Sequence, residues 1–276
     1  ATGTFEQLAG KYPDTAEGKN SLYQLVEAAV KIDNLDVARD AVERIAADPA
    51  AYGIDTFARI GELMLSNSLY EQAISAYEKL LNAAGESGVK ERAYFGVGKS
   101  LLEKGDCGRA AENLQALLAL NRRTGFFFDA NLYLARALKQ CGSHDEALDA
   151  LREIFTLDSD RVRLRKANVE LAGIQAAQGR AADAYATYLR MVLTTEDPAR
   201  PPELVDINRS AALAAIELGM KMADYETVIF LADRFQGHWG KDEAIASVRE
   251  VKNQALLERS KLLAGKEEES LVELME

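Results

Sequence analysis

Two histidines and two cysteines are the side chains of this 276-residue chain best suited to bind a metal or act as nucleophiles. His144 and His238 lie in separate segments, and neither has a cysteine or carboxylate at the spacing of zinc ligands. The sequence Gly-Ser-His-Asp at 142–145 is better suited to end one helix and cap the next. We therefore predict no metal site and no cofactor.

Sequence signatures of catalysis are also missing. No segment reads as a strand, and no glycine-rich phosphate-binding loop follows one, because Gly96 and Gly98 lie inside a predicted helix. There is no nucleophile elbow. Glutamates 267–269 form a solvated acidic run, whereas catalytic carboxylates need buried, asymmetric surroundings. We predict that the protein is not an enzyme.

The overall charge limits the kinds of partner. The chain has 33 lysines and arginines against 44 aspartates and glutamates, giving a net charge of −11. A field of this sign disfavours nucleic acid, so we predict no nucleic-acid partner. No apolar run is long enough for a transmembrane segment. The sequence starts without methionine or a signal-peptide pattern, which we interpret as a fragment or processed form, and the compartment, periplasmic or cytoplasmic, stays open.

A recurring pair of amphipathic helices must position any binding residues. In residues 131–155, apolar residues at helical spacing lie on both sides of a break at 142–145. A small residue, Ala135, precedes an alanine of the second helix, Ala147, by twelve residues. Large residues follow four positions after that alanine in several units. The second-helix alanines recur at steps of 35 or 37 residues, as Ala38, Ala73, Ala110, Ala147 and Ala184.

These positions resemble the tetratricopeptide repeat (TPR) family in its bacterial form, whose motif has a small residue at position 8, alanine at 20 and an aromatic near 24. The match is strongest at residues 66–81 and 179–191, although the period here is mostly 37 residues rather than 34. The resemblance implies an all-α fold. We expect a right-handed superhelical solenoid of antiparallel helix pairs, with a divergent last repeat and a C-terminal capping helix.

The repeat register divides the chain into five parts. Residues 1–13 would be the second helix of a truncated preceding repeat, and its uncovered apolar face would favour self-association. Five TPR-like helix pairs follow at 20–193, and a proline-rich connector at 194–202. A divergent sixth pair would occupy 203–236, and a capping helix with an acidic tail 241–276.

The two cysteines fall in equivalent turns of adjacent predicted repeats. A disulfide between Cys107 and Cys141 needs Cα atoms within about 7 Å, which is a tight requirement for neighbouring repeats. We therefore predict two free thiols.

Phe126, Phe127 and Phe128 form an unusual run. Three consecutive helix positions span about 200°, so these rings cannot all face one core. We expect at least one to be exposed or packed beneath a neighbouring loop.

In the TPR family the first helices line a groove that binds partner segments. Carried over position by position, the resemblance implies groove residues Tyr23, Glu27, Arg92, Phe95, Lys99, Leu132, Arg136, Lys139 and Lys166. From Arg92 to Lys166 this set is basic with apolar residues interleaved, although the whole chain is acidic. It predicts binding of an acidic or C-terminal peptide segment. Alternatively, these cations belong to an ordinary solvated helix face.

We therefore predict a non-enzymatic scaffold that binds a protein or peptide segment in the groove. The alternative is a structural spacer or assembly module of a larger bacterial cell-envelope protein, acting through its terminal faces. The sequence FEQLAGKYPD at 5–14 supports this alternative, because it resembles repeat ends common in bacterial periplasmic assembly and secretion proteins.

Overall fold

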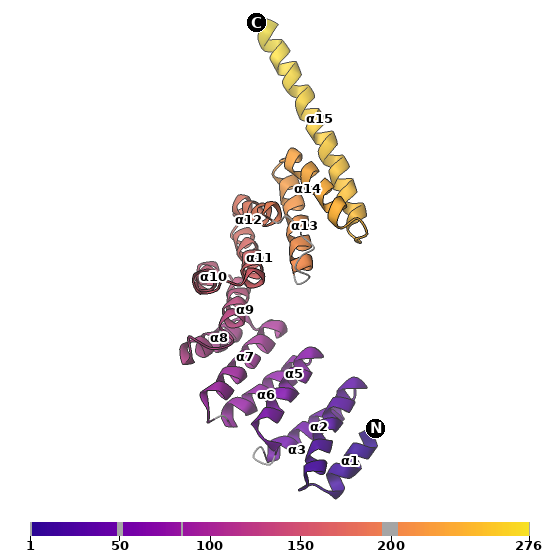
Figure 1. Ribbon diagram of the computed structural model, residues 1–276, viewed down its shortest axis with the longest axis vertical. Coiled ribbons are helices and arrows are strands. Elements are labelled where there is room, and N and C mark those ends of the chain that lie inside the picture. Colours follow the sequence, from indigo (N-terminus) through magenta and orange to yellow (C-terminus); the bar gives the residue numbers. More distant parts are fainter. Residues whose placement is uncertain (1, 49–51, 84, 195–203, 276) are drawn as a thin grey trace. The chain divides into compact units, whose positions relative to one another are not determined.

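A computed structural model describes residues 2–48, 52–83, 85–194 and 204–275 (Figure 1). Over these ranges the chain forms helices and no β-strand, which confirms the predicted all-α fold. It divides into two compact units, residues 1–150 and 151–276, and each is described by itself.

Unit 1 is an array of antiparallel helix pairs. The helices α1–α3 pack in succession, as do α5–α9, and the first helices of the pairs, α2, α5, α7 and α9, also contact one another in that order. α10 crosses the boundary between the units. The elements are α1 (Thr2–Lys11), α2 (Ala16–Lys31), α3 (Leu35–Ala47), α5 (Ile54–Ser66), α6 (Tyr70–Ala83), α7 (Ser87–Lys104), α8 (Cys107–Leu120), α9 (Phe127–Gln140) and α10 (His144–Leu157).

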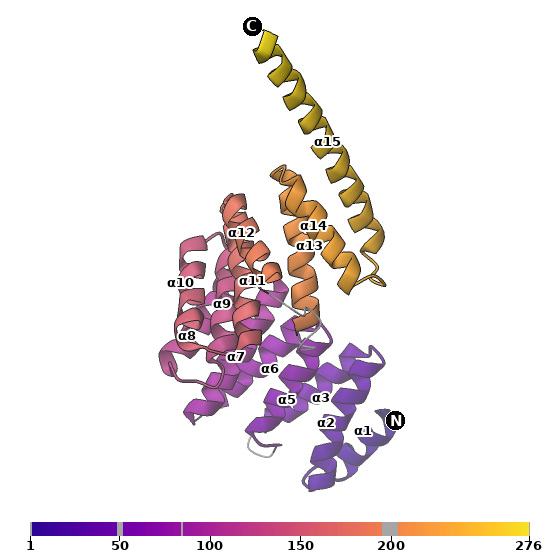
Figure 2. The same cartoon turned by 45° about the horizontal axis from the view of Figure 1, so that its top comes forward.

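Unit 2 continues the same arrangement with five helices in the described residues: α11 (Arg161–Ala177), α12 (Ala181–Leu193), α13 (Val205–Lys221), α14 (Tyr225–His238) and α15 (Ile245–Met275). Each packs against the next. α15 starts beside α14, and the rest of it extends past α14 (Figure 2). The helix also includes the acidic residues up to Met275. Nearly all of the predicted connector at 194–202 lies outside the described residues.

The turn inside each pair repeats the same backbone conformation. One residue per turn has a positive φ, between 56° and 95°. Glycine adopts this conformation without steric cost, and it fills three of the six positions. The six residues are Asp33, Ser68, Gly105, Gly142, Gly179 and Ala223. They are spaced by 35, 37, 37, 37 and 44 residues, and the first four spacings equal those predicted from the alanines.

A large residue of the second helix packs against a small residue of the first. Tyr77 of α6 is 3% exposed, and its ring lies between α5 and α7. A Cβ atom would approach that ring to 2.6 Å if added at Gly61 and to 2.4 Å at Gly96. In the next pair, a Cβ at Gly98 would lie 2.7 Å from Leu114. These close approaches explain why the small and large positions recur together.

The prediction of free thiols is wrong, because Cys107 and Cys141 form a disulfide with their Cα atoms 5.7 Å apart. Cys107 is the first residue of α8, and Cys141 directly follows α9. Since α8 and α9 are antiparallel and packed together, the start of α8 lies beside the end of α9. The sequence estimate overlooked this proximity between turns of neighbouring repeats.

Replacing Gly96 by alanine tests the packing around Tyr77. The added methyl group has to displace a buried ring, so we expect a loss of about 1–3 kcal/mol in the free energy of unfolding. Gly108, with no neighbouring atom within 4 Å of an added Cβ, is the control. Gly108→Ala should leave stability unchanged or raise it by up to about 1 kcal/mol. Urea denaturation of both variants measures the difference, and equal midpoints would contradict the packing argument.

Removing the disulfide should destabilise the protein. The cross-link closes a loop of 34 residues, for which chain entropy predicts a loss of about 3–4 kcal/mol. Thermal unfolding with and without a reductant measures this. The Cys107→Ser/Cys141→Ser variant should unfold at the temperature of the reduced protein and be insensitive to reductant. A wild-type transition unaffected by reductant, together with two titratable thiols, would refute the cross-link.

Candidate functional site

Five side chains from α7, α9 and the turn before α9 form a compact surface on unit 1, here called the aromatic–basic patch: Phe95, Lys99, Phe126, Tyr133 and Arg136. The rings of Phe95 and Phe126 are stacked with centroids 4.8 Å apart. Tyr133 meets Phe95 edge-on at 5.8 Å. All five are half-buried, so the patch combines ordered apolar surface with access from solvent.

Two cations of the patch share the ring of Tyr133. The Lys99 ammonium lies 5.4 Å from the ring centroid, and the Arg136 guanidinium carbon lies 5.3 Å from it. Attraction between a cation and an aromatic face restrains both side chains. The arrangement therefore presents two ordered positive charges next to apolar rings, which suits a ligand carrying a carboxylate.

A buried carboxylate positions Phe126. The Thr124 hydroxyl donates to Glu91 Oε2 at 2.7 Å, and its oxygen accepts from the Phe126 backbone N–H at 3.2 Å. Asn121 Nδ2 also donates to Glu91, at 2.9 Å. Glu91 of α7 thus holds the turn between α8 and α9, which places Phe126 against Phe95.

Hydrogen bonding keeps Glu91 ionised. The bonds from Asn121 and Thr124 lower the pKa of the Glu91 carboxyl below its ordinary value of 4.5, although burial alone would raise it. The side chain is 8% exposed. The Glu91 carboxylate therefore accepts hydrogen bonds from the protein itself and does not contact a ligand.

The predicted groove residues nearer the N-terminus each interact with a neighbouring side chain of the protein. Arg92 pairs with Glu62 at 2.7 Å and with Asp55 at 3.8 Å, and the bond to Glu62 raises the Arg92 pKa. Glu27 pairs with Lys31 at 3.1 Å. Tyr23 is another predicted groove residue, and the Arg59 guanidinium lies 4.0 Å from the centroid of its ring. The positive charge of Arg92 is thus compensated by acidic neighbours.

The remaining predicted groove residues, Leu132, Lys139 and Lys166, do not form a common surface with the patch. Leu132 is 4% exposed, which places it in the packed interior of unit 1. Lys139 is half-buried near the end of α9. Lys166 is exposed on α11, which belongs to unit 2, so the structure does not group it with the α7 and α9 residues.

Sequence reasoning missed two members of the patch. Tyr133 was not assigned to the groove, because the family positions select Leu132 instead. Tyr133 precedes Arg136 by three residues, and this helical spacing could have indicated a shared face. Phe126 belongs to the run of three phenylalanines. None of the three is exposed, because Phe126 and Phe127 are half-buried and Phe128 is buried, and the ring of Phe126 stacks on Phe95 of α7.

A hollow of about 370 Å³ adjoins the patch through Lys99. Its other lining residues come from the end of α5, the start of α6 and from α7, and they include Glu62, Tyr70 and Glu103. A ligand bound at Lys99 can therefore extend toward acidic side chains.

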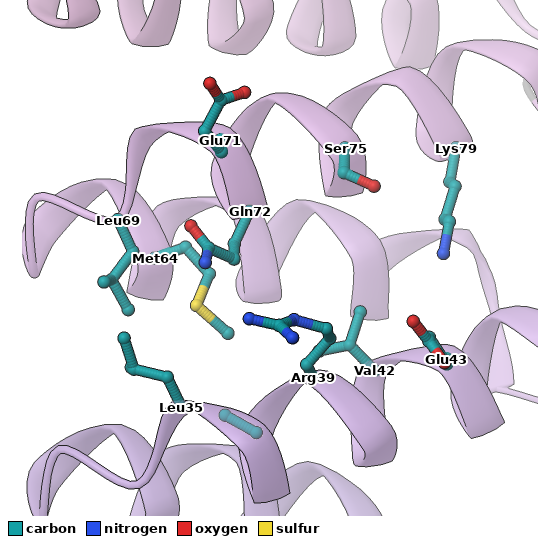
Figure 3. A pocket seen from close by; sticks show the side chains of 11 residues that line it. Leu35, Arg39, Val42, Glu43, Met64, Leu69, Glu71, Gln72, Ser75 and Lys79 are labelled. Carbon is teal, nitrogen blue, oxygen red and sulfur yellow. The ribbon is translucent and has the colours of Figure 1, made fainter.

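A second hollow, of about 340 Å³, lies between the second helices α3 and α6 (Figure 3). Leu35, Met64 and Leu69 gather at one end, and Glu43 and Lys79 lie at the other. The Arg39 side chain extends between α3 and α6 toward the apolar end. No predicted groove residue lines this hollow, so it is a separate surface.

The described residues contain neither a metal-binding cluster nor a membrane-spanning helix. Among them, no group of three or more histidine, cysteine, aspartate or glutamate side chains is arranged to hold a metal ion. No helix in the described ranges is both long and apolar enough to cross a membrane.

Solved structures share this fold. A tetratricopeptide repeat protein from Parabacteroides merdae ATCC 43184 is 16% identical, with a TM-score of 0.53 over 91% of each chain. PilW, a type IV pilus biogenesis factor, is 13% identical, with a TM-score of 0.54 over 85% of this chain and 99% of its own. BtubC from P. vanneervenii is 15% identical, with a TM-score of 0.55 over 87% and 93%.

No protein-family model and no curated protein sequence matches the chain. The structural similarity shows the fold, which is the all-α helix-pair repeat of TPR proteins.

Substituting Glu91 by glutamine tests its positioning role. Losing the charge-assisted bonds should cost about 1–3 kcal/mol of unfolding free energy at neutral pH. Because the folded-state pKa is lowered, the stabilisation is present above the ordinary value of 4.5 and is lost as pH falls through the folded-state pKa. The stability difference between wild type and Glu91→Gln should therefore shrink as the solution is acidified below pH 4.5.

The control is Glu103→Gln, which changes an exposed glutamate of the same helix. It should leave neutral-pH stability within about 0.5 kcal/mol of wild type. Denaturant titrations from neutral to acid pH measure both variants. A Glu91→Gln difference that stays constant over this range would show that the carboxylate charge is not responsible.

Proposed function

We propose that this protein is a non-enzymatic interaction scaffold whose aromatic–basic patch binds a carboxylate-bearing segment of another protein. The observation that carries the proposal is the pair of cations on Tyr133 beside the stacked rings of Phe95 and Phe126. The TPR-type fold supports it, because repeat arrays of this kind present extended binding surfaces.

The chemistry of the patch defines the ligand. A carboxylate, from an acidic side chain or a chain terminus, pairs with Lys99 and Arg136. An adjacent apolar side chain covers Phe95, and aromatic anchors of this kind contribute most of the energy in many interfaces. The hollow with Tyr70 and Glu103 then accommodates a basic or hydroxyl side chain further along the segment.

Charge reversal tests this proposal. A displayed library of peptides with free C-termini is selected on the wild-type protein, and the enriched peptides are synthesised for affinity measurements. We expect acidic or C-terminal carboxylate motifs, and an affinity loss of more than about tenfold for Lys99→Glu/Arg136→Glu. The matched control, Arg39→Glu/Lys79→Glu, makes the same charge change at the α3–α6 hollow and should leave binding intact.

Two results would contradict the proposal. One is enrichment of peptides whose affinity is the same for wild type and the patch variant. The other is an equal loss in both double variants, which would indicate a general effect of net charge.

A second candidate function is that of a spacer or assembly module in a bacterial cell-envelope protein. The Cys107–Cys141 disulfide favours it, since disulfides persist in oxidising compartments such as the periplasm. The fold is also shared with PilW, described as a pilus biogenesis factor. Such a module would act through its terminal faces and not through the aromatic–basic patch.

A further inference from the structure

The first helix pair, α2 and α3, departs from the repeat pattern at two positions that line the α3–α6 hollow. One residue after the recurring alanine of the second helix, α3 carries Arg39. The next four pairs carry apolar or aromatic residues there, namely Ile74, Ala111, Leu148 and Tyr185. Four residues after the alanine, α3 has Val42, whereas the next pair has the larger Tyr77. A charged side chain and a smaller one thus replace apolar volume in the first pair.

The residues that line the hollow form one face of each helix. On α3 they include Leu35, Arg39 and Val42, spaced by four and three residues, and on α6 Gln72, Ser75 and Lys79, spaced by three and four. Such spacings place the side chains on one side of a helix. The two faces border about 340 Å³, which lies within the range of small-molecule sites, about 300–1,000 Å³.

The hollow has an apolar end with a cation beside it. Leu35, Met64 and Leu69 gather at the apolar end, and the Arg39 side chain extends toward them (Figure 3). Arg39 pairs with Asp36 of its own helix at 3.6 Å, but this ion pair is largely exposed and restrains the guanidinium little. A guanidinium has five N–H donors, so Arg39 retains donors for a ligand.

The charges that line the hollow favour an anion. Glu71 is compensated by Lys104 of α7, which lies 2.6 Å from its carboxylate. This leaves the cations Arg39 and Lys79 against Glu43 among the charged residues of the lining. An anionic ligand group therefore meets more positive than negative charge.

We infer that the α3–α6 hollow binds a small amphipathic carboxylate, such as a medium-chain fatty acid. The carboxylate pairs with the Arg39 guanidinium, and the aliphatic chain lies against Leu35, Met64 and Leu69. The hollow uses no residue of the aromatic–basic patch, so the inference is independent of the proposed function.

NMR of the methionine methyl groups in the full chain tests the site. The chain has five methionines, and Met64 is the one that lines this hollow. With isotope-labelled methyl groups, sodium octanoate should shift the Met64 signal, which the Met64→Leu variant assigns. Acetate, which lacks the aliphatic chain, and octan-1-ol, which lacks the carboxylate, should each bind at least about tenfold more weakly.

Arg39→Gln tests the role of the cation. It should raise the dissociation constant for octanoate at least about tenfold and leave that for octan-1-ol unchanged. The control is Arg109→Gln, which removes an exposed arginine of α8 that also pairs, at 3.6 Å, with an aspartate three residues before it. This control should leave both constants unchanged, as should Lys99→Glu/Arg136→Glu in the aromatic–basic patch.

The inference is wrong if the Met64 signal stays unchanged up to about 20 mM octanoate. It is also wrong if Arg39→Gln binds octanoate as tightly as wild type does, or if Lys99→Glu/Arg136→Glu abolishes octanoate binding. A Met64 shift caused by a library-selected peptide would contradict it as well, because the hollow would then be a peptide site.

Discussion

In unit 1, the contact between a large residue of one helix and a glycine of the next sets the distance between the two helices. The packing of the helix pairs depends on this contact. The ring of Tyr77 lies between α5 and α7 because neither Gly61 nor Gly96 has a side chain to exclude it. Gly98 accommodates Leu114 in the same way. The glycines of α7 thus pack against the second helices of the pairs. Phe95 and Lys99 of the same helix contact Phe126 and Tyr133.

The α8–α9 pair adds a second constraint, because it is fixed at both ends. At the connecting turn, buried Glu91 binds Asn121 and Thr124 and so places Phe126. At the opposite end, the Cys107–Cys141 disulfide joins the start of α8 to the residue after α9. A binding surface gains affinity when its side chains are ordered before the ligand arrives. The Glu91 hydrogen bonds and the disulfide restrain α9 and its preceding turn. They therefore order Phe126, Tyr133 and Arg136 of the aromatic–basic patch before a ligand binds.

The helical repeat could be predicted from the sequence because small and large residues recur at a spacing that the fold imposes. The turn residues from Asp33 to Gly179 follow the predicted register of the alanines. The second contact of Tyr77, with Gly96, could not be foreseen, since it joins neighbouring pairs rather than two helices of one pair. The disulfide was missed for a similar reason: its distance depends on how adjacent pairs stack.

The candidate site was predictable only in part. Family positions include Phe95, Lys99 and Arg136 of the aromatic–basic patch, but they select Leu132, which is buried, and not its neighbour Tyr133, whose ring lies beside Arg136. A difference of one residue turns a helical side chain by about 100°, which is enough to exchange a buried position for a surface one. Compensation of Arg92 by Glu62 and Asp55 was also not deducible, because it requires the relative positions of α5 and α7.

The crystal structure of the protein with a library-selected peptide tests the central claim most directly. The account predicts a ligand carboxylate within hydrogen-bond distance, about 3 Å, of both the Lys99 ammonium and the Arg136 guanidinium. It also predicts an apolar side chain of the ligand against Phe95. A peptide bound in the α3–α6 hollow, with the aromatic–basic patch still open to solvent, would contradict it.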